Sequence, residues 1–399
     1  MTQPSSRRMF KKMAAVASVG LLAAVAACGG SDGGGDGDTK ELVIGYSAGL
    51  SGGAAEYGVN VQNGLKMAID EVNEEGVEID GQKYTVKLES LDDQYQPGTT
   101  GTNVQRLVER DGASVVFIPH AGGIKAAQEL NSGRTEFLIG AYSSDPAILD
   151  ADNPLTVMIP PSFDSYVQPF IDKVKGDGAA KLGLMATASE FGQEWTKTTV
   201  EKWEAAGGEV LAKNNIDYGT VSDFAGPVAK TLAGNPDVIL VGGPSQPTAL
   251  LIEEAREQGF DGAFLIIDQA KFEELEEFTD PENLNNSVSI MPLPLFDGTA
   301  DFIENYKERF NSDKPVNADI ALNYQALPIF IEAMKIAGSV DDPQAIRDAM
   351  PEAVKAVKGV FFTPNAISDK GHLQADGLQA AFRNKNGEYE PFEITQPKE

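Results

Sequence analysis

The strongest constraint on the fold is an alternation of short apolar runs with longer segments of helical periodicity. The first apolar runs lie at 42–46, 84–88, 114–118 and 136–140. Between them, apolar residues recur at helical spacing in 60–73, 104–108 and 126–131. Strands that alternate with helices in this way form a parallel sheet flanked by helices. The sequence therefore predicts an α/β fold.

The same alternation starts again after a proline pair, Pro160 and Pro161. Because two prolines rule out a regular helix, we place the join between two α/β units there. The second unit has predicted strands at 182–185, 237–241 and 264–267, and predicted helices at 194–206, 222–232 and 247–258. The C-terminal part predicts helices at 301–310, 318–337 and 343–350, then strands at 378–382 and 389–394. Asn386-Gly387 between these strands is a strong hairpin turn. The order suggests that the chain passes back between two lobes.

An export signal precedes the first predicted strand and ends at the single cysteine, Cys28. A basic start with the pair Arg7-Arg8 leads into the apolar run 13–27, and a Gly/Asp tract follows the cysteine. The run is short for a membrane-spanning helix, which needs about 20 residues. The order resembles a bacterial or archaeal lipoprotein signal, which implies a diacylglycerol on the Cys28 sulfur. We therefore predict a signal peptide at 1–27 and a lipidated, flexible tether at 28–39. The mature chain would work outside the cytoplasm, anchored to a membrane.

The export route stays open. The arginine pair, followed by Phe10 and Lys12, resembles the twin-arginine signal for export of folded proteins. Ordinary signals also contain such pairs.

Composition excludes several classes of function. The 399-residue chain has a formal net charge of −28, which becomes −32 once Arg7, Arg8, Lys11 and Lys12 leave with the signal. Such a surface repels phosphate backbones, so nucleic acid is excluded as a partner. Two histidines, and no cysteine beyond Cys28, leave little material for metal binding or for catalysis by these side chains. The acidity fits either a well-solvated surface or adaptation to high salt.

Three motifs that could carry chemistry are incomplete. Residues 49–53 match Gly-x-Ser-x-Gly, but residues 54–58 intervene before the predicted helix. A glycine loop whose backbone N–H groups approach a ligand at a helix N-terminus explains this motif better. Asp92 and Asp93 lack the further oxygen ligands of a calcium site. His120 follows a strand, where a lining or structural role is favoured over catalysis. The sequence thus predicts neither an enzyme nor a metal or cofactor site.

A ring of loops at the carboxyl ends of the predicted strands remains as the candidate site. Open α/β sheets bind ligands at this edge. The loops carry aromatic, hydroxyl, glycine and carboxylate groups, which suit a small polar organic molecule. They include Tyr57, Gly122, Gly123, Tyr142, Ser143, Ser144, Glu190, Phe191, the loop 243–246 and Asp268.

At these residues the chain resembles the branched-chain amino-acid-binding protein family, the type I solute-binding proteins of ABC importers. The resemblance runs from about residue 42 to 394, and the order and spacing of its stretches make it specific. These stretches are 49–52, 55–58, 68–73, 91–97, 143–146, 190–192, 241–243, 359–362 and 369–373.

The resemblance implies two Rossmann-like lobes of the periplasmic binding protein-like I fold, joined by three hinge crossovers. We place the crossovers near 159–160, 291–292 and 361–363. Lobe one would comprise 40–160 plus 291–360, and lobe two 161–290 plus 361–399. The lobes would close on a ligand in the cleft by hinge motion. A permease, with its ATPase on separate chains, would recognise the closed monomer.

The resemblance also assigns roles to site residues. In relatives that bind amino acids, a hydroxyl and backbone groups at the first-lobe glycine loop hold the carboxylate, and a second-lobe acid faces the ammonium. Ser144 matches a hydroxyl after the fourth strand, and Asp268 matches the acid. Gly122 stands where serine is common, and Pro244 where an aromatic residue is common, which leaves amino acids, amides, urea and aromatic acids open as ligands. The predicted ligand-binding residues are Tyr57, Gly122, Gly123, Tyr142, Ser143, Ser144, Phe191, Ser245 and Asp268.

The sequence therefore predicts an extracytoplasmic, lipid-anchored substrate-binding protein of an ABC importer for a small polar solute, such as an amino acid. The alternative is a ligand-sensing module that docks to a membrane signalling receptor.

Overall fold

The structure, a computed structural model, describes residues 39–131, 135–151, 153–176, 178–213, 216–221 and 223–396. The predicted signal peptide, the lipidation at Cys28 and the tether up to residue 38 lie outside the described residues. Within the described ranges, no helix combines the length and apolar character that a membrane crossing requires.

The first sheet has the strand order β2-β3-β1-β4-β5-β6. The strands are parallel except for β2, which pairs antiparallel with β3. The central strands β4 and β5 are buried along their whole length, as expected for parallel strands covered by helices on both faces. The elements are β1 (Lys40–Ala48), α1 (Ala55–Glu75), β2 (Val77–Ile79), β3 (Gln82–Asp92), α2 (Pro97–Glu109), β4 (Val115–Ile118), α3 (Ala121–Leu130), β5 (Leu138–Ala141) and β6 (Thr156–Met158).

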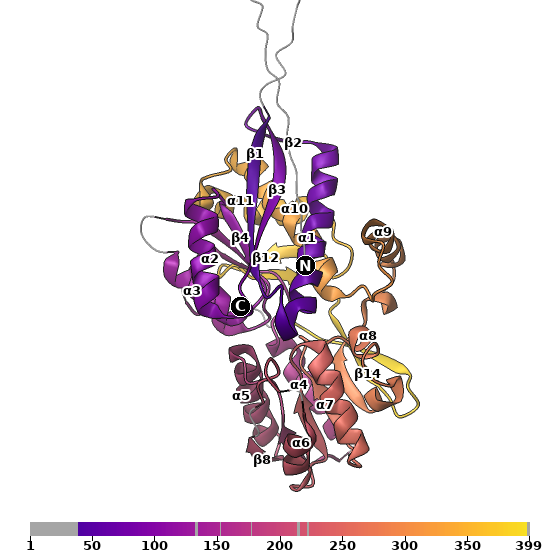
Figure 1. The fold of residues 1–399 in the computed structure, drawn as a ribbon. Coiled ribbons are helices and arrows are strands. Elements are labelled where there is room, and N and C mark those ends of the chain that lie inside the picture. Colours follow the sequence, from indigo (N-terminus) through magenta and orange to yellow (C-terminus); the bar gives the residue numbers. More distant parts are fainter. Residues whose placement is uncertain are drawn as a thin grey trace, which may run out of the picture. The chain divides into compact units, whose positions relative to one another are not determined.

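The second sheet has the order β15-β14-β11-β10-β9-β7-β8, with helices α5, α6 and α7 packed around it (Figure 1). Strands β7 to β11 are parallel, and the hairpin β14–β15 adds to the edge of β11 in antiparallel fashion. The elements are α4 (Asp164–Lys175), β7 (Lys181–Leu184), α5 (Glu190–Ala205), β8 (Glu209–Lys213), α6 (Ala225–Leu232), β9 (Val238–Val241), α7 (Ser245–Glu257), β10 (Ala263–Ile266), α8 (Phe272–Leu275), β11 (Ser287–Ile290), β14 (Gln379–Arg383) and β15 (Tyr389–Glu393). The hairpin turns at Asn386-Gly387, as predicted, with Gly387 at φ 82°.

Three C-terminal helices, α9 (Ala300–Phe310), α10 (Ala318–Ala337) and α11 (Pro343–Ala356), return to the first sheet. Helix α10 is buried along most of its length and shares a core with β1, α1 and β4. The rings of Phe117 on β4 and Phe330 on α10 lie 5.1 Å apart. The antiparallel pair β12 (Pro364–Ile367) and β13 (Leu373–Ala375) then leads back to β14 in the second sheet.

The chain therefore passes between the sheets three times, after β6, after β11 and after α11. These passages lie next to the predicted crossovers at 159–160, 291–292 and 361–363. The lobe limits drawn at those positions stay a prediction.

Several regions differ from the sequence-based assignment, among them the short elements α8, β12 and β13, which were not predicted. Helix α4 was not predicted, because Pro169 interrupts its apolar pattern one turn after it begins. Helix α3 begins at Ala121 rather than 126, because the His120 side chain caps it there. Its first turn contains two glycines, which interrupt the apolar pattern. Helix α11 continues through Pro351 to Ala356 instead of ending at 350. The strands β2, β6, β8 and β11 have three to five residues each, too few for a periodic signal.

Helices α1 and α10 approach each other closely at Gly64. A Cβ atom at this position would collide with the main-chain oxygen of Ile320. We expect Gly64→Ala to lower the free energy of unfolding by at least the roughly 1–3 kcal/mol typical of overpacked cores, because a backbone atom cannot move aside. Urea denaturation of residues 40–399 measures the change.

Gly101→Ala in helix α2 is the matched control. A Cβ at residue 101 would meet only Leu130, at 3.8 Å. Alanine should therefore raise stability by up to about 1 kcal/mol through its helix propensity. Equal effects of the two substitutions would contradict the close approach of α1 and α10.

Candidate ligand-binding site

A cavity lies where loops of the two sheets face each other. The cavity volume is about 40 Å³, which is room for a few waters at roughly 10–15 Å³ each. Loops that follow β3, β4, β5 and β10 line it, together with the beginnings of α4, α5 and α10. Its wall is largely aromatic, from Tyr57, Tyr95, Tyr142, Tyr166, Phe191, Phe361 and Phe362.

Six of the nine predicted ligand-binding residues line this cavity: Tyr57, Tyr142, Ser143, Ser144, Phe191 and Asp268. Residues 142–144 follow the end of β5, and Asp268 follows the end of β10. The carboxyl ends of parallel strands thus bring together segments that are far apart in the chain. A role of these residues in binding stays a prediction.

The other three predicted residues do not line the cavity and have other partners. At Gly122, a Cβ would lie 2.7 Å from the Cγ of Pro97. The Gly123 N–H donates to the Nδ1 of His120 at 3.0 Å. The Ser245 hydroxyl donates to Glu274, outside the cavity.

The glycine loop at 49–53 does not fit its predicted role either. None of its residues lines the cavity. The Leu50 N–H and the Ser51 hydroxyl donate to the Asp92 carboxylate, at 2.9 and 2.6 Å. These groups therefore fix the loop to the end of β3 instead of facing a ligand.

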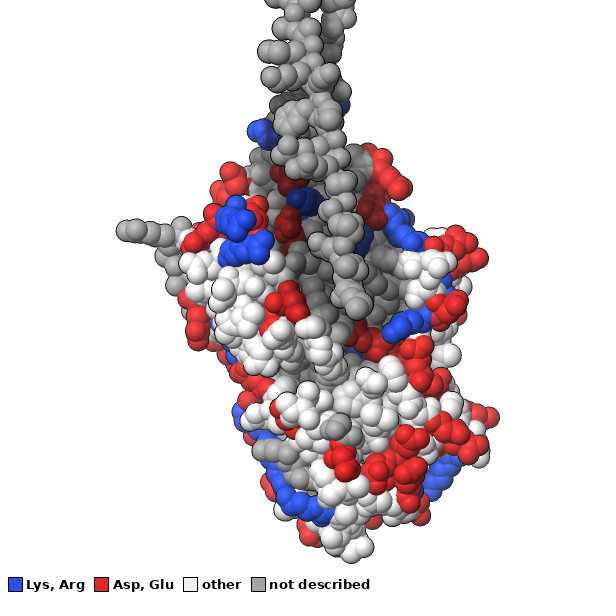
Figure 2. Space-filling view, in the orientation of Figure 1, with Lys and Arg blue, Asp and Glu red and all other residues white. Residues whose placement is uncertain are grey.

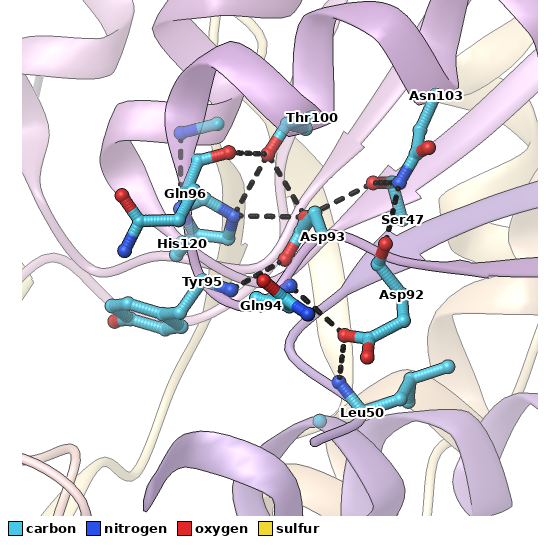
Figure 3. A network of polar contacts seen from close by, with 12 residues as sticks. Ser47, Leu50, Asp92, Asp93, Gln94, Tyr95, Gln96, Thr100, Asn103 and His120 are labelled. Atoms are coloured by element: carbon cyan, nitrogen blue, oxygen red, sulfur yellow. Dashed lines mark hydrogen bonds and ion pairs between the residues drawn. The ribbon is translucent and has the colours of Figure 1, made fainter. Parts of the chain in front are cut away.

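Asp93 is the centre of a buried polar network under the cavity wall (Figure 3). It accepts hydrogen bonds from the hydroxyls of Ser47 and Thr100, both at 2.9 Å, and its Oδ2 lies 3.1 Å from the Nε2 of His120. The His120 ring stacks on Tyr95 at 4.6 Å and lines the cavity, so it has both of the roles considered from the sequence. In the part of the chain that the structure describes, no group of acidic, histidine or cysteine side chains is arranged to hold a metal ion.

A buried ion pair crosses the cavity. The sequence analysis did not predict it. The Nζ of Lys271, after β10, lies 2.7 Å from the Oδ1 of Asp319, on α10, and both side chains are at most 3% exposed. Tyr142 donates its hydroxyl proton to the same oxygen at 2.7 Å. Burial opposes the charge of Lys271, but the neighbouring carboxylates, Asp319 first, raise its pKa above the ordinary value, so the ammonium stays charged.

The carboxylate of Asp268 is also buried and accepts a hydrogen bond from the Trp195 indole at 3.0 Å. Burial raises the pKa of Asp268, and the Ser144 hydroxyl, the Lys271 ammonium and the Trp195 N–H partly oppose the rise. Two further buried atoms of the wall have no hydrogen-bond partner among the described residues: Gln269 Oε1 and Asp319 Oδ2. Because buried polar atoms are almost always paired, these two acceptors are available to water or to a polar ligand in the cavity.

Some residues of the cavity wall were not predicted from the sequence. They differ in whether a sequence signal could have identified them. Gln269 and Lys271 follow the same strand end as Asp268, so the strand-end rule could have included them. Tyr166 belongs to α4, the helix that was not predicted. Asp319 has no local signal, because only the packing of α10 brings it to the cavity.

Another buried carboxyl group, that of Glu274, forms hydrogen bonds with elements of both sheets beside the cavity. It accepts hydrogen bonds from Asn60 on α1, at 2.5 Å, from Asn317 at the start of α10, and from Ser245 on α7. Burial, with the Asp319 carboxylate as the next cause, raises the pKa of Glu274 from 4.5 to about 8. The raised pKa therefore favours the protonated form of Glu274 in the folded state near neutral pH, and in this form Oε2 donates to the Ser245 hydroxyl instead of accepting from it.

Comparisons with known proteins agree with this geometry. A family model described as periplasmic binding protein matches residues 41–387. The Leu/Ile/Val-binding protein homolog 1 of Brucella suis is 25% identical over 355 residues, covering 86% of this chain and 88% of the relative. The matching family consists of substrate-binding proteins and not of enzymes. This confirms the prediction that the chain is not an enzyme.

Two solved structures show the same fold. The branched-chain amino acid transporter substrate-binding protein of Streptococcus pneumoniae, in complex with isoleucine, has a TM-score of 0.72 at 21% identity and covers 90% of this chain and 100% of its own. An ABC transporter solute-binding protein of R. palustris, in complex with benzoate, has a TM-score of 0.73 at 16% identity, covering 90% and 97%. The fold class predicted from the sequence is confirmed.

The raised pKa of Glu274 predicts a pH dependence of stability. Between its ordinary value of 4.5 and about 8, the folded state binds a proton that the unfolded state has lost. The free energy of unfolding should therefore fall as pH rises through this window, by up to about 1.4 kcal/mol per pH unit for one proton. Glu274→Gln keeps the acceptor oxygen and should make the fall smaller.

Urea unfolding at pH 5, 6, 7 and 8 measures the slope. Glu277→Gln, at an exposed position on the same segment, is the control and should keep the wild-type slope. A wild-type slope in Glu274→Gln would show that this carboxyl is not protonated in the folded state.

Proposed function

We propose that this chain, which belongs to the periplasmic binding protein family, is the lipid-anchored substrate-binding protein of an ABC importer. Its family binds small molecules outside the cytoplasm and works with ABC transporter permeases. In our proposal it captures a small polar organic solute, an amino acid or a related compound, by hinge closure and delivers it to the permease.

The observation that carries this proposal is the cavity whose polar groups come from both sheets. Lys271 follows a strand of the second sheet, and Asp319 lies on a helix that packs on the first. The Gln269 amide likewise donates to the hydroxyl of Tyr95, which follows β3, at 3.1 Å. A solute held by such groups contacts both halves at once, so its binding free energy favours the conformation in which they meet.

The proposed roles follow from the positions of the groups. Tyr57, Tyr142 and Phe191 form aromatic walls, and the hydroxyls of Ser143 and Ser144 contact polar groups of the solute. Asp268 accepts hydrogen bonds from an ammonium or amide. The lobes meet further along the cleft through Lys125 on α3 and Glu190 on α5, whose Nζ and Oε1 lie 2.7 Å apart.

Hinge motion needs few and local flexible points, and the three passages between the sheets meet this requirement. The passages after β6 and β11 contain Pro160, Pro161 and Pro292, which leave only a short stretch of chain free to rotate. A permease that contacts both lobes would recognise the closed form by its shape.

The importer role predicts that solute uptake depends on this chain. Cells that lack the gene should lose high-affinity uptake of the solute that copurifies with the protein, and a plasmid-borne copy should restore it. Radiolabelled uptake assays measure the difference. Unchanged uptake in the deleted strain would contradict the importer role, and loss of a behavioural or transcriptional response instead would favour the signalling alternative.

The lipid anchor predicts the fate of a Cys28 variant. Wild-type protein should incorporate labelled palmitate and sediment with membranes, because two acyl chains hold a protein stably whereas one does so only marginally. Cys28→Ser should lose the label and appear in the soluble extracytoplasmic fraction. The purified domain 40–399 should bind the solute with unchanged affinity, which separates anchoring from binding. Equal labelling of wild type and Cys28→Ser would overturn the anchor.

A further inference from the structure

We propose that the cavity selects an organic cation, an amine with N–H donors and no free carboxylate. This inference rests on the proposed function, since it names the class of solute that the same cavity binds. It is carried by four features: side-chain caps on three helix N-termini, a filled space at Gly122 next to the cavity, two carboxyl groups against one lysine in the wall, and unpaired acceptors near aromatic side chains.

The N-termini of α3, α5 and α10 are already capped by the chain's own side chains, whereas α4, which also begins at the cavity wall, has no side-chain cap. A helix N-terminus with free N–H groups is a natural site for an anion. At the start of α3, His120 accepts from the Gly123 N–H. Ser189 caps α5, and Asn317 caps α10 by accepting from the N–H groups of residues 319 and 320. At these three helix starts, a ligand carboxylate would have to displace a cap.

A side chain that carries a hydroxyl, such as serine, does not fit easily at position 122. A Cβ there would meet Pro97 at 2.7 Å and Glu190 Oε2 at 3.2 Å. Glu190 itself is paired with the Lys125 ammonium. The lack of space at this point therefore disfavours a serine hydroxyl that would hold a ligand carboxylate.

The ionisable groups of the wall include more carboxyl groups than cationic ones. Among the described residues that line the cavity, Asp268 and Asp319 are the carboxyl groups and Lys271 is the one lysine or arginine. The Lys271 ammonium is bound to Asp319 and also donates to the Gln269 main-chain oxygen at 3.1 Å. A ligand carboxylate would compete with Asp319 for it, whereas a ligand ammonium would pair with Asp268. Burying a charge without a partner is costly, so the cation is the matched ligand.

The unpaired polar atoms and the rings fit the same ligand. Gln269 Oε1 and Asp319 Oδ2 can only accept hydrogen bonds. An ammonium or amidinium supplies N–H donors to such atoms. Aromatic rings attract a cation through their negative π surface, and Tyr57, Tyr142 and Phe191 line the cavity.

The outer surface favours the same charge. Patches of acidic side chains lie on both halves of the face seen in Figure 2, and the chain has a formal net charge of −28. A field of this sign concentrates cations near the cleft and repels anions, an effect that weakens as salt rises.

Matched series of small molecules test this inference on the wild-type protein by isothermal titration calorimetry. One series is phenethylamine, phenylalaninamide, phenylalanine and 3-phenylpropanoate. The other is isoamylamine, leucinamide, leucine and 4-methylpentanoate. Within a series, the amine and the amide should bind at least tenfold more tightly than the amino acid, and the acid should bind most weakly.

Two substitutions locate the effect. Asp268→Asn should weaken binding of the amines by at least tenfold. Asp261→Asn, an exposed change of the same charge in the same region, should leave the affinity within twofold of wild type. Equal weakening in both variants would assign the preference to the general acidity of the protein and overturn the role of the cavity.

The outcomes also separate this inference from the proposed function. If amino acids or acids bind as tightly as the amines, or if no amine binds, the inference is overturned while the importer role stands. If the amines bind as expected but uptake does not depend on the protein, the inference stands and the importer role falls.

Discussion

A charged lysine can stay buried only when a carboxylate lies beside it, and this constraint governs how the two halves of the chain meet. Lys271 follows a strand of the second sheet, and its partner Asp319 lies on α10, which packs on the first sheet. The pair therefore requires the C-terminal helices to return across the cleft after β11. Tyr142, from the loop after β5, bonds to the same carboxylate, so three segments distant in the chain converge on one oxygen. The cavity is built around this point of convergence.

The glycine-rich and acidic motifs near the cavity support its wall instead of contacting a ligand. Asp92 fixes the glycine loop, and Asp93 binds Ser47, Thr100 and His120 in one buried network. This network orients the His120 ring, which caps α3 and stacks on Tyr95. Residues that look like candidates for chemistry in the sequence thus act by positioning the groups that line the cleft. The same arrangement occupies the helix N-terminus that would otherwise attract an anion.

Most of the fold was predictable, because strands buried on both faces and helices with one apolar face leave clear periodic signals. The failures have local causes: Pro169 hides α4, and the shortest strands are too short to show a period. In the site, Asp268 and residues 142–144 were found because they follow strand ends. Gly122, Gly123 and Ser245 also lie next to strand ends, but their groups face Pro97, His120 and Glu274. The strand-end rule places a loop at the cleft and does not say where each atom points.

The sequence by itself determined the α/β class, the two successive units, the hairpin near the C-terminus and the absence of a catalytic set in the loops. These features depend on local periodicity, on turn chemistry and on the amounts of each residue type, all of which are properties of short stretches. Only the tertiary structure decided that Asp319 faces Lys271, that Glu274 joins α1, α7 and α10, and that His120 caps the N-terminus of α3. Each of these depends on the spacing between atoms of distant segments. Such spacing is set by how helices pack on sheets, which no local pattern contains.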